Sequence, residues 1–132
     1  MSTQTLTIEV GAGELLDKLS ILRIKLDRIK DPAKRINVEY EERVLSSVRS
    51  AHLPEAPTLD ALENELRRIN EALWQIEDDI RACEAAKDFG PRFIELARSV
   101  YKQNDRRALV KKKINTYCGS AIVEEKSYTQ TS

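Results

Sequence analysis

The feature that most constrains the fold is an unbroken series of apolar residues between Thr58 and Lys87. Its members recur at alternating steps of three and four positions, the spacing that places side chains on one face of an α-helix. They are Leu59, Leu62, Leu66, Ile69, Leu73, Ile76, Ile80 and Cys83. The series predicts one long amphipathic helix, capped by Thr58, whose apolar face packs against other helices.

Three further helices are predicted from apolar spacing and from residues that start and stop helices. The first begins at Glu14 and is followed by a shorter helix over residues 32–52, since Asp31 can cap free amides and Pro32 fits a first turn. The last covers residues 91–117, between Gly90, which suits a left-handed exit from the preceding helix, and Gly119. The buried candidates of the shorter helix are Val38, Val44, Leu45 and Val48. We expect an all-α protein, an antiparallel bundle of three long helices and one shorter helix.

The two ends of the chain differ from its helical middle. Leu6, Ile8 and Val10 alternate with polar residues, which predicts one short strand ahead of a glycine-containing turn. The segment 120–132 is predicted to be an extended tail, partly ordered through Tyr128, with Ile122, Val123 and Tyr128 as its apolar anchors. It pairs with the predicted strand, lies in a groove, or is disordered at its end. We expect one domain over residues 1–132, with a strand and turn at 1–13, helices at 14–119 and the tail at 120–132.

The composition of the chain limits the kinds of partner and cofactor that we expect. The 22 basic and 22 acidic residues give a net charge of zero, and aromatics make up only 5% of the chain, so we expect no nucleic-acid partner. No segment is apolar enough for a membrane span or a signal peptide, which favours a cytoplasmic protein. Cys83, Cys118 and the single His52 lie at no metal-ligand spacing, and we expect no metal and no cofactor.

The last helix departs from the apolar pattern. Its apolar stripe passes through Asn104, Arg107 and Lys111 before apolar character returns at Ile114. Buried polar groups are costly unless they are paired, so this stretch predicts polar partners on neighbouring helices. A polar stripe on the long helix offers them: Arg67, Asn70, Trp74, Glu77, Arg81 and Glu84. The first helix adds Glu14, Lys18 and Lys25, with Asp17 nearby.

Three interpretations of this polar seam remain open. It is a network of ion pairs that fixes helix register, a pocket for a small anionic ligand, or a catalytic site with Glu77 or Glu84 as acid or base. Arginine and lysine suit the second because they bind phosphate and carboxylate groups. The candidate ligand-binding residues are Lys18, Lys25, Trp74, Glu77, Arg81, Arg98, Tyr101, Asn104, Asp105, Arg107, Lys111 and Tyr128.

Several segments carry a resemblance to a known family. They are GELLDK (13–18), NEALWQIEDDIR (70–81), FIELARSVY (93–101), NDRRA (104–108) and EEKSY (124–128). Over nearly its whole length the chain resembles a small, uncharacterised all-helical family of bacteria and phages that has no established activity. Genes of that family often lie near genes for glycosyltransferases and surface polysaccharides, which implies a link to glycan metabolism. The resemblance implies no catalytic residue.

We therefore expect a non-catalytic accessory protein that binds a polar or anionic small ligand or a partner protein, in surface-glycan biosynthesis. The alternative is a small helical enzyme acting on a sugar phosphate or a dicarboxylate through Arg and Lys binding groups and Glu acid/base groups. The long helix also carries Ala72 and Trp74 outside its main apolar face, which favours a homodimer.

Overall fold

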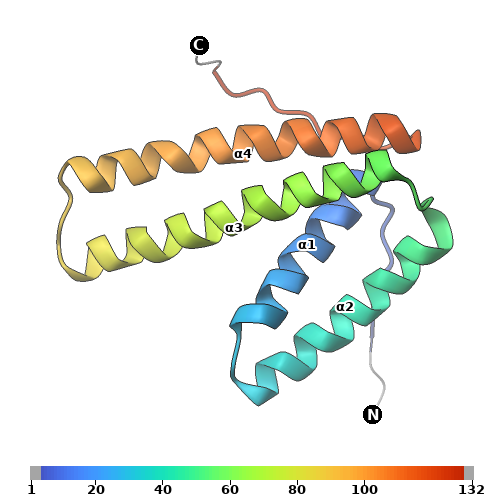
Figure 1. Cartoon of the computed structure of the whole chain (residues 1–132), viewed down its shortest axis with the longest axis horizontal. Helices are drawn as coiled ribbons and strands as arrows, with labels where there is room; N and C mark the ends of the chain where they lie inside the picture. Colours follow the sequence, from blue (N-terminus) through green and yellow to red (C-terminus); the bar gives the residue numbers. More distant parts are fainter. Residues whose placement is uncertain (1–3, 130–132) are drawn as a thin grey trace.

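The computed structural model describes residues 4–129 and contains four α-helices in that range. They are α1 (Ala12–Arg28), α2 (Pro32–His52), α3 (Pro57–Ala85) and α4 (Pro91–Cys118) (Figure 1). The all-α prediction is confirmed. Within the described range, none of these helices is both long enough and apolar enough to cross a membrane.

The helices form two hairpins that meet at an angle. Figure 1 shows α3 and α4 side by side along their length, with the α1–α2 pair leaving them steeply. The first helix packs against both α3 and α4, whereas in the described residues the backbone of α2 lies close to α1 alone. The predicted antiparallel pairs are present, but the arrangement is three packed helices with α2 on the outside. The predicted bounds of α2, residues 32–52, are confirmed, but the shorter helix is α1 with 17 residues and not α2 with 21; α3 has 29 residues and α4 has 28.

The outer position of α2 overturns part of its predicted core. Val44 and Val48 are 43% and 41% exposed, because the face they share points away from α1. The C-terminal end of α2 is held by charge instead. The buried Arg49 places two guanidinium nitrogens 2.5 and 2.8 Å from one carboxylate oxygen of Glu63 on α3, and a third lies 3.2 Å from Glu55. Burial alone would lower the pKa of Arg49, but these carboxylates raise it.

The apolar core lies where α1 crosses α3 and α4. Its largest fully buried side chains include Leu19, Leu59, Leu66 and Ile114. The buried residues of α4 all fall within its C-terminal part, from Val110 to Asn115. The opposite end of the α3–α4 hairpin is therefore a two-helix projection.

The start of α1 approaches α4 unusually closely. A Cβ added to Gly13 would lie 2.5 Å from the carbonyl oxygen of Lys111, so only glycine fits there without a shift. The Gly13 amide donates to Oδ1 of Asn115 at 2.8 Å, and the Ala12 amide donates to Oγ of Ser120 at 3.0 Å. These two acceptors satisfy free amides of the first turn, which explains why α1 begins at Ala12 rather than at the predicted Glu14.

Three predictions about segment ends were wrong. Residues 6–10 form no strand, and Leu6 is 82% exposed, because no second strand in the described range offers a ladder of hydrogen bonds. The long helix begins at Pro57 after Ala56, without a side-chain cap from Thr58. The left-handed residue after it is Lys87, with φ 56°, and not Gly90, with φ −81°. The predicted Asp31 cap is confirmed, and so is the end of the last helix at Gly119, which is left-handed with φ 67°.

The C-terminal segment runs back along α4 as an extended chain. Its attachment is through charged side chains, since Ile122 and Tyr128 are 45% and 76% exposed. Glu124 pairs with Lys111 at 2.7 Å, and Lys126 pairs with Asp105 at 3.3 Å. The predicted tail is thus extended through residue 129, but the apolar anchors expected for it are largely exposed. Residues 1–3 and 130–132 of the predicted end segments lie outside the described range.

Candidate functional site

Lys111 of α4 is a buried cation that lies where α1, α4 and the tail contact one another. Its residue is 8% exposed, and its Nζ lies 2.8 Å from Glu14, 2.7 Å from Glu124 and 3.9 Å from Asp17. Burial alone would lower the pKa of Lys111, but the hydrogen bonds to Glu124 and Glu14 and the nearby carboxylate charges raise it. The same hydrogen bond and charge lower the pKa of Glu124. The lysine therefore stays charged and is fully occupied by protein carboxylates.

A second buried group, Asn70 of α3, connects three helices. Its Nδ2 donates to Asp17 at 2.9 Å and to Ser20 at 3.2 Å, both on α1. Its Oδ1 accepts a hydrogen bond of 3.3 Å from Nη1 of Arg107 on α4. Because the two donor bonds fix the amide, the oxygen is held in place to orient the Arg107 guanidinium.

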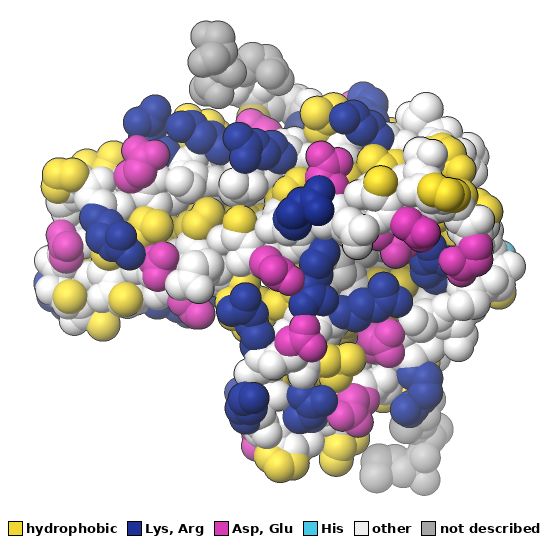
Figure 2. Space-filling model, in the orientation of Figure 1, with side chains coloured by type: hydrophobic (Ala, Val, Ile, Leu, Met, Phe, Trp, Pro, Cys, Tyr) yellow, Lys and Arg dark blue, Asp and Glu magenta, His cyan; other side chains and the backbone are white. Residues whose placement is uncertain are grey.

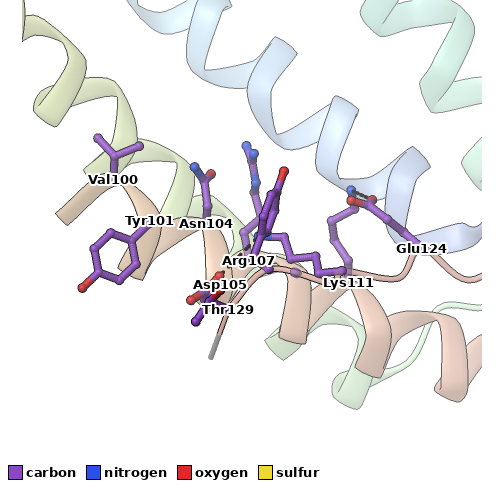
Figure 3. A pocket seen from close by; sticks show the side chains of 11 residues that line it. Val100, Tyr101, Asn104, Asp105, Arg107, Lys111, Glu124 and Thr129 are labelled. Atoms are coloured by element: carbon purple, nitrogen blue, oxygen red, sulfur yellow. Dashed lines mark hydrogen bonds and ion pairs between the residues drawn. The ribbon is translucent and has the colours of Figure 1, made fainter. Parts of the chain in front are cut away.

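Arg107 differs from Lys111 in its lack of a close ion pair. It is half-buried, and it forms no ion pair with any carboxylate of residues 4–129. Figure 3 shows its side chain and that of Asn104 pointing the same way from α4, while Tyr101 points away from them. The charge of Arg107 also helps to lower the pKa of Glu124, but no carboxylate of the described residues forms a close ion pair with it. A guanidinium that is oriented and free of a close ion pair is suited to receive a bidentate anion.

Two cavities adjoin this arginine. One, of about 710 Å³, lies between α4 and the tail, and we call it the tail cavity. Its polar lining residues include Asp105, Lys126 and Thr129. The other, of about 540 Å³, lies between α1, α3 and α4, and we call it the Trp74 cavity after its aromatic wall. The Arg28 guanidinium lies 5.7 Å from the centroid of the Trp74 ring.

Charge on the surrounding surface is mixed. Figure 2 shows Lys and Arg side chains interspersed with Asp and Glu over the face of the molecule that it draws. Within residues 4–129, no group of three His, Cys, Asp or Glu side chains is arranged to hold a metal ion. The arrangement can therefore orient one cation toward two cavities without a large field of one sign around it.

Comparison with known proteins supplies the family. A family model described as a family of unknown function, DUF6165, matches residues 6–132. The chain belongs to the DUF6165 family. Comparisons with curated proteins and with solved structures each found no match. The expected membership of a family without established activity is confirmed, while its distribution in bacteria and phages and its gene neighbourhood stay predictions.

In this DUF6165 chain, nine of the twelve predicted ligand-binding residues line one or both cavities. The tail cavity is lined by Tyr101, Asn104, Asp105, Arg107, Lys111 and Tyr128. The Trp74 cavity is lined by Trp74, Glu77, Arg81, Asn104 and Arg107. The other three lie elsewhere: Lys18 pairs with Glu14 at 3.8 Å, Arg98 pairs with Glu95 at 3.7 Å, and Lys25 is half-buried on α1.

The predicted polar stripe of α3 divides into two parts in the DUF6165 chain. Asn70 and Trp74 face the other helices, and Arg67 reaches Asp27 of α1 at 2.5 Å. Glu77 and Arg81 form an exposed pair at 3.7 Å, and Glu84 is exposed. Of the whole stripe, only Asn70 therefore belongs to a buried hydrogen-bond network.

Several polar groups of the DUF6165 site were not among the predicted binding residues, and three of them show why. Ser20 lies on the apolar face of α1, between Leu16 and Ile24, where a polar residue among apolar ones is a usable signal. Asn70 was placed on the polar stripe, but nothing in the sequence shows that Asp17 would fix its amide. The cap supplied by Asn115 was missed, because it depends on a contact 102 residues apart in the chain.

Proposed function

We propose that this DUF6165 chain binds a small anionic ligand, with Arg107 as the central contact. The observation that carries the proposal is the state of that side chain. Arg107 is oriented by Asn70 at 3.3 Å, lacks a carboxylate partner among the described residues, and faces two cavities. A half-buried guanidinium without a close ion pair is accessible to an anionic ligand, which would supply a charged partner.

Lys111 has a different role in this proposal. Three carboxylates already surround its amine, two of them within hydrogen-bond distance. A ligand anion would have to displace one of them to reach it. We therefore assign Lys111 to the attachment of the tail, which brings Glu124 and the residues after it over α4.

The groups around Arg107 favour a phosphate or carboxylate group on a polar molecule. The guanidinium presents parallel N–H donors that match two oxygens of such a group. Asn104 shares the same face of α4 and can donate or accept one more hydrogen bond. Tyr101 and Tyr128 add aromatic surface to the tail cavity.

The test is calorimetry with sugar phosphates, sugar nucleotides and dicarboxylates on the unmodified chain and on Arg107→Gln. We expect at least one of these anions to bind, and the substitution to weaken its binding about tenfold to a hundredfold, the worth of a charge-assisted hydrogen bond of about 1.5–3 kcal/mol. Arg98→Gln is the matched control, since Arg98 is an exposed arginine of the same helix that lines neither cavity. Equal losses in both variants, or no binding by any anion, would contradict the proposal.

The remaining expectations stay predictions. A role in surface-glycan biosynthesis rests on the resemblance, whereas a cytoplasmic location, a protein partner and a homodimer rest on the sequence. The alternative of an enzyme with Glu77 or Glu84 as acid or base has less support, because both side chains are exposed and Glu77 pairs with Arg81.

A further inference from the structure

The two cavities share one wall. Val100, Asn104 and Arg107 line both, and their spacing places them along a single ridge of α4. A ligand group bound on Arg107 would therefore sit between two separate spaces rather than at the end of one. This geometry limits the class of ligand, provided that Arg107 has the proposed function of binding an anion.

The Trp74 cavity has a largely apolar and aromatic wall. Ile21 and Ile24 of α1 and Leu73 and Trp74 of α3 line it. Besides Arg107, its charged residues are Glu77, Asp78 and Arg81, which are all exposed. Glu77 and Arg81 pair with each other at 3.7 Å. A flat, weakly polar group such as a nucleobase suits this wall, because aromatic rings stack on one another.

The tail cavity has a different character. Its walls carry Asp105, Lys126 and Thr129, which offer hydrogen-bond donors and acceptors in one place. Tyr101 and Tyr128 provide apolar ring surface beside them. A group with many hydroxyls, such as a sugar, needs both: hydrogen-bonding partners for its hydroxyls and an apolar surface for its C–H faces.

We infer that the ligand has two ends joined by an anionic linkage. The linkage, a pyrophosphate or phosphodiester, lies over Arg107 and Asn104. The planar end enters the Trp74 cavity, and the hydroxyl-bearing end enters the tail cavity. A nucleoside diphosphate joined to a sugar has this order of groups, and a single sugar phosphate or nucleotide fills only one half of the site.

The experiment compares whole ligands with their halves by calorimetry. The probes are UDP-glucose and GDP-mannose, the corresponding nucleoside diphosphates, and the sugar 1-phosphates. We expect at least one whole ligand to bind tenfold or more tightly than either of its halves. If no whole ligand binds more tightly than its better half, the inference of a two-ended ligand is overturned.

Substitutions assign each end to its cavity. Trp74→Ala should weaken binding of the whole ligand and the nucleoside diphosphate about tenfold and leave the sugar 1-phosphate unchanged. Tyr128→Ala should weaken the whole ligand and the sugar 1-phosphate and leave the nucleoside diphosphate unchanged. Trp74→Phe keeps an aromatic ring and should restore most of the affinity, which separates a lost stacking surface from a damaged fold. Equal losses for both halves in each variant would contradict the assignment.

Arg107→Gln separates this inference from the proposed function. If the sugar 1-phosphates or nucleoside diphosphates bind and lose affinity in Arg107→Gln, but whole ligands gain nothing over them, the anion site stands and the two-ended ligand is wrong. If Arg107→Gln leaves the binding of every probe unchanged, the proposed function is wrong as well.

Discussion

Two adjacent lysines of α4 show how much the same side chain can differ in its surroundings. Lys111 is 8% exposed and contacts three carboxylates, whereas the side chain of Lys112 is 53% exposed and pairs with Glu125 at 3.3 Å. A buried charge depends on its partners, because water cannot replace them. A surface pair is screened and contributes little.

Replacing these lysines by methionine should therefore have unequal effects. We expect Lys111→Met to lower the free energy of unfolding by about 2–3 kcal/mol, somewhat less than for a fully buried pair because Glu14 and Glu124 are partly hydrated. Lys112→Met should cost less than about 1 kcal/mol. Urea denaturation of the two variants measures the difference, and similar midpoints would show that burial of Lys111 has no energetic consequence.

The Lys111–Glu124 pair also predicts a dependence on pH. Because the folded pKa of Glu124 is lowered, its contribution to stability is full above the ordinary glutamate pKa of about 4.3 and is lost as the pH falls through the lowered value. Because the folded pKa of Lys111 is raised, its contribution is full below the ordinary lysine pKa of about 10.4 and is lost as the pH rises through the raised value.

The variant Glu124→Gln tests the acid side of this dependence. The difference in unfolding free energy between it and the unmodified chain should be constant near neutral pH and shrink below about pH 4. Glu125→Gln is the control, since it removes the neighbouring surface pair with Lys112. A difference that grows toward acid pH would show that Glu124 is not stabilised in its charged form.

At the scale of elements, the contact between α1 and α4 is set by the glycines at the start of α1. Gly13 is a helical residue, and in an isolated helix its replacement by alanine would stabilise by about 1 kcal/mol. Here the new methyl group would meet the Lys111 carbonyl at 2.5 Å, so the two helices would have to separate.

Gly13→Ala should therefore destabilise the protein, by about 1–3 kcal/mol, against the sign of its helix propensity. Gly90→Ala is the comparison, because the nearest atom to its added methyl is a side-chain oxygen of Asp88 at 3.3 Å. Thermal unfolding of both variants shows directly whether each substitution raises or lowers the stability. A Gly13→Ala protein as stable as the original would mean that α1 and α4 can move apart at no cost.

The elements differ in how far the sequence predicts them. The start of α2 is predictable because Asp31 and Pro32 act locally, and Asp31 accepts a hydrogen bond from the Lys34 amide at 3.3 Å. The predicted strand at residues 6–10 is wrong, because alternation describes a strand only when another strand lies beside it. The attachment of the tail was assigned to apolar residues, since the pairing of Glu124 with Lys111 depends on the folded path of the chain.

At the scale of the whole molecule, burial is uneven. Buried residues concentrate in the first half of α3 and near the end of α4, where α1 packs on both. In the other half of the α3–α4 hairpin, Cys83 is buried, while Phe89 and Ile94 are 50% and 56% exposed. Regions with few buried apolar contacts open more readily.

Amide hydrogen exchange should follow this division. We expect amides of residues 76–100 to exchange faster than those of residues 59–70 and 108–115, although all three segments are mainly helical. Exchange measured by mass spectrometry on overlapping peptides resolves these segments. Equal protection along the entire hairpin would indicate that its projecting end is covered in solution, as in the predicted homodimer.

The candidate site is more predictable from the sequence than the arrangement of helices around it. The interruption at Asn104 and Arg107 marks the face of α4 that adjoins both cavities, because polar residues in an apolar stripe need partners wherever the stripe packs. Lys111 was expected to contact ligand, but the sequence does not show that Glu14, Asp17 and Glu124 would converge on it. Whether Lys111 or Arg107 is paired with carboxylates depends on distances between segments that are far apart in the chain, and the sequence does not give these distances.

The hydrogen bond between Ala12 and Ser120 joins residues 108 positions apart. Bringing such distant segments together costs loop-closure entropy, whereas α3 and α4 are joined by a short turn and can pair early. During synthesis, α1 leaves the ribosome before the other three helices, yet the groups that satisfy its amides are made more than a hundred residues later. The first helix of the chain is thus the one whose start is completed last.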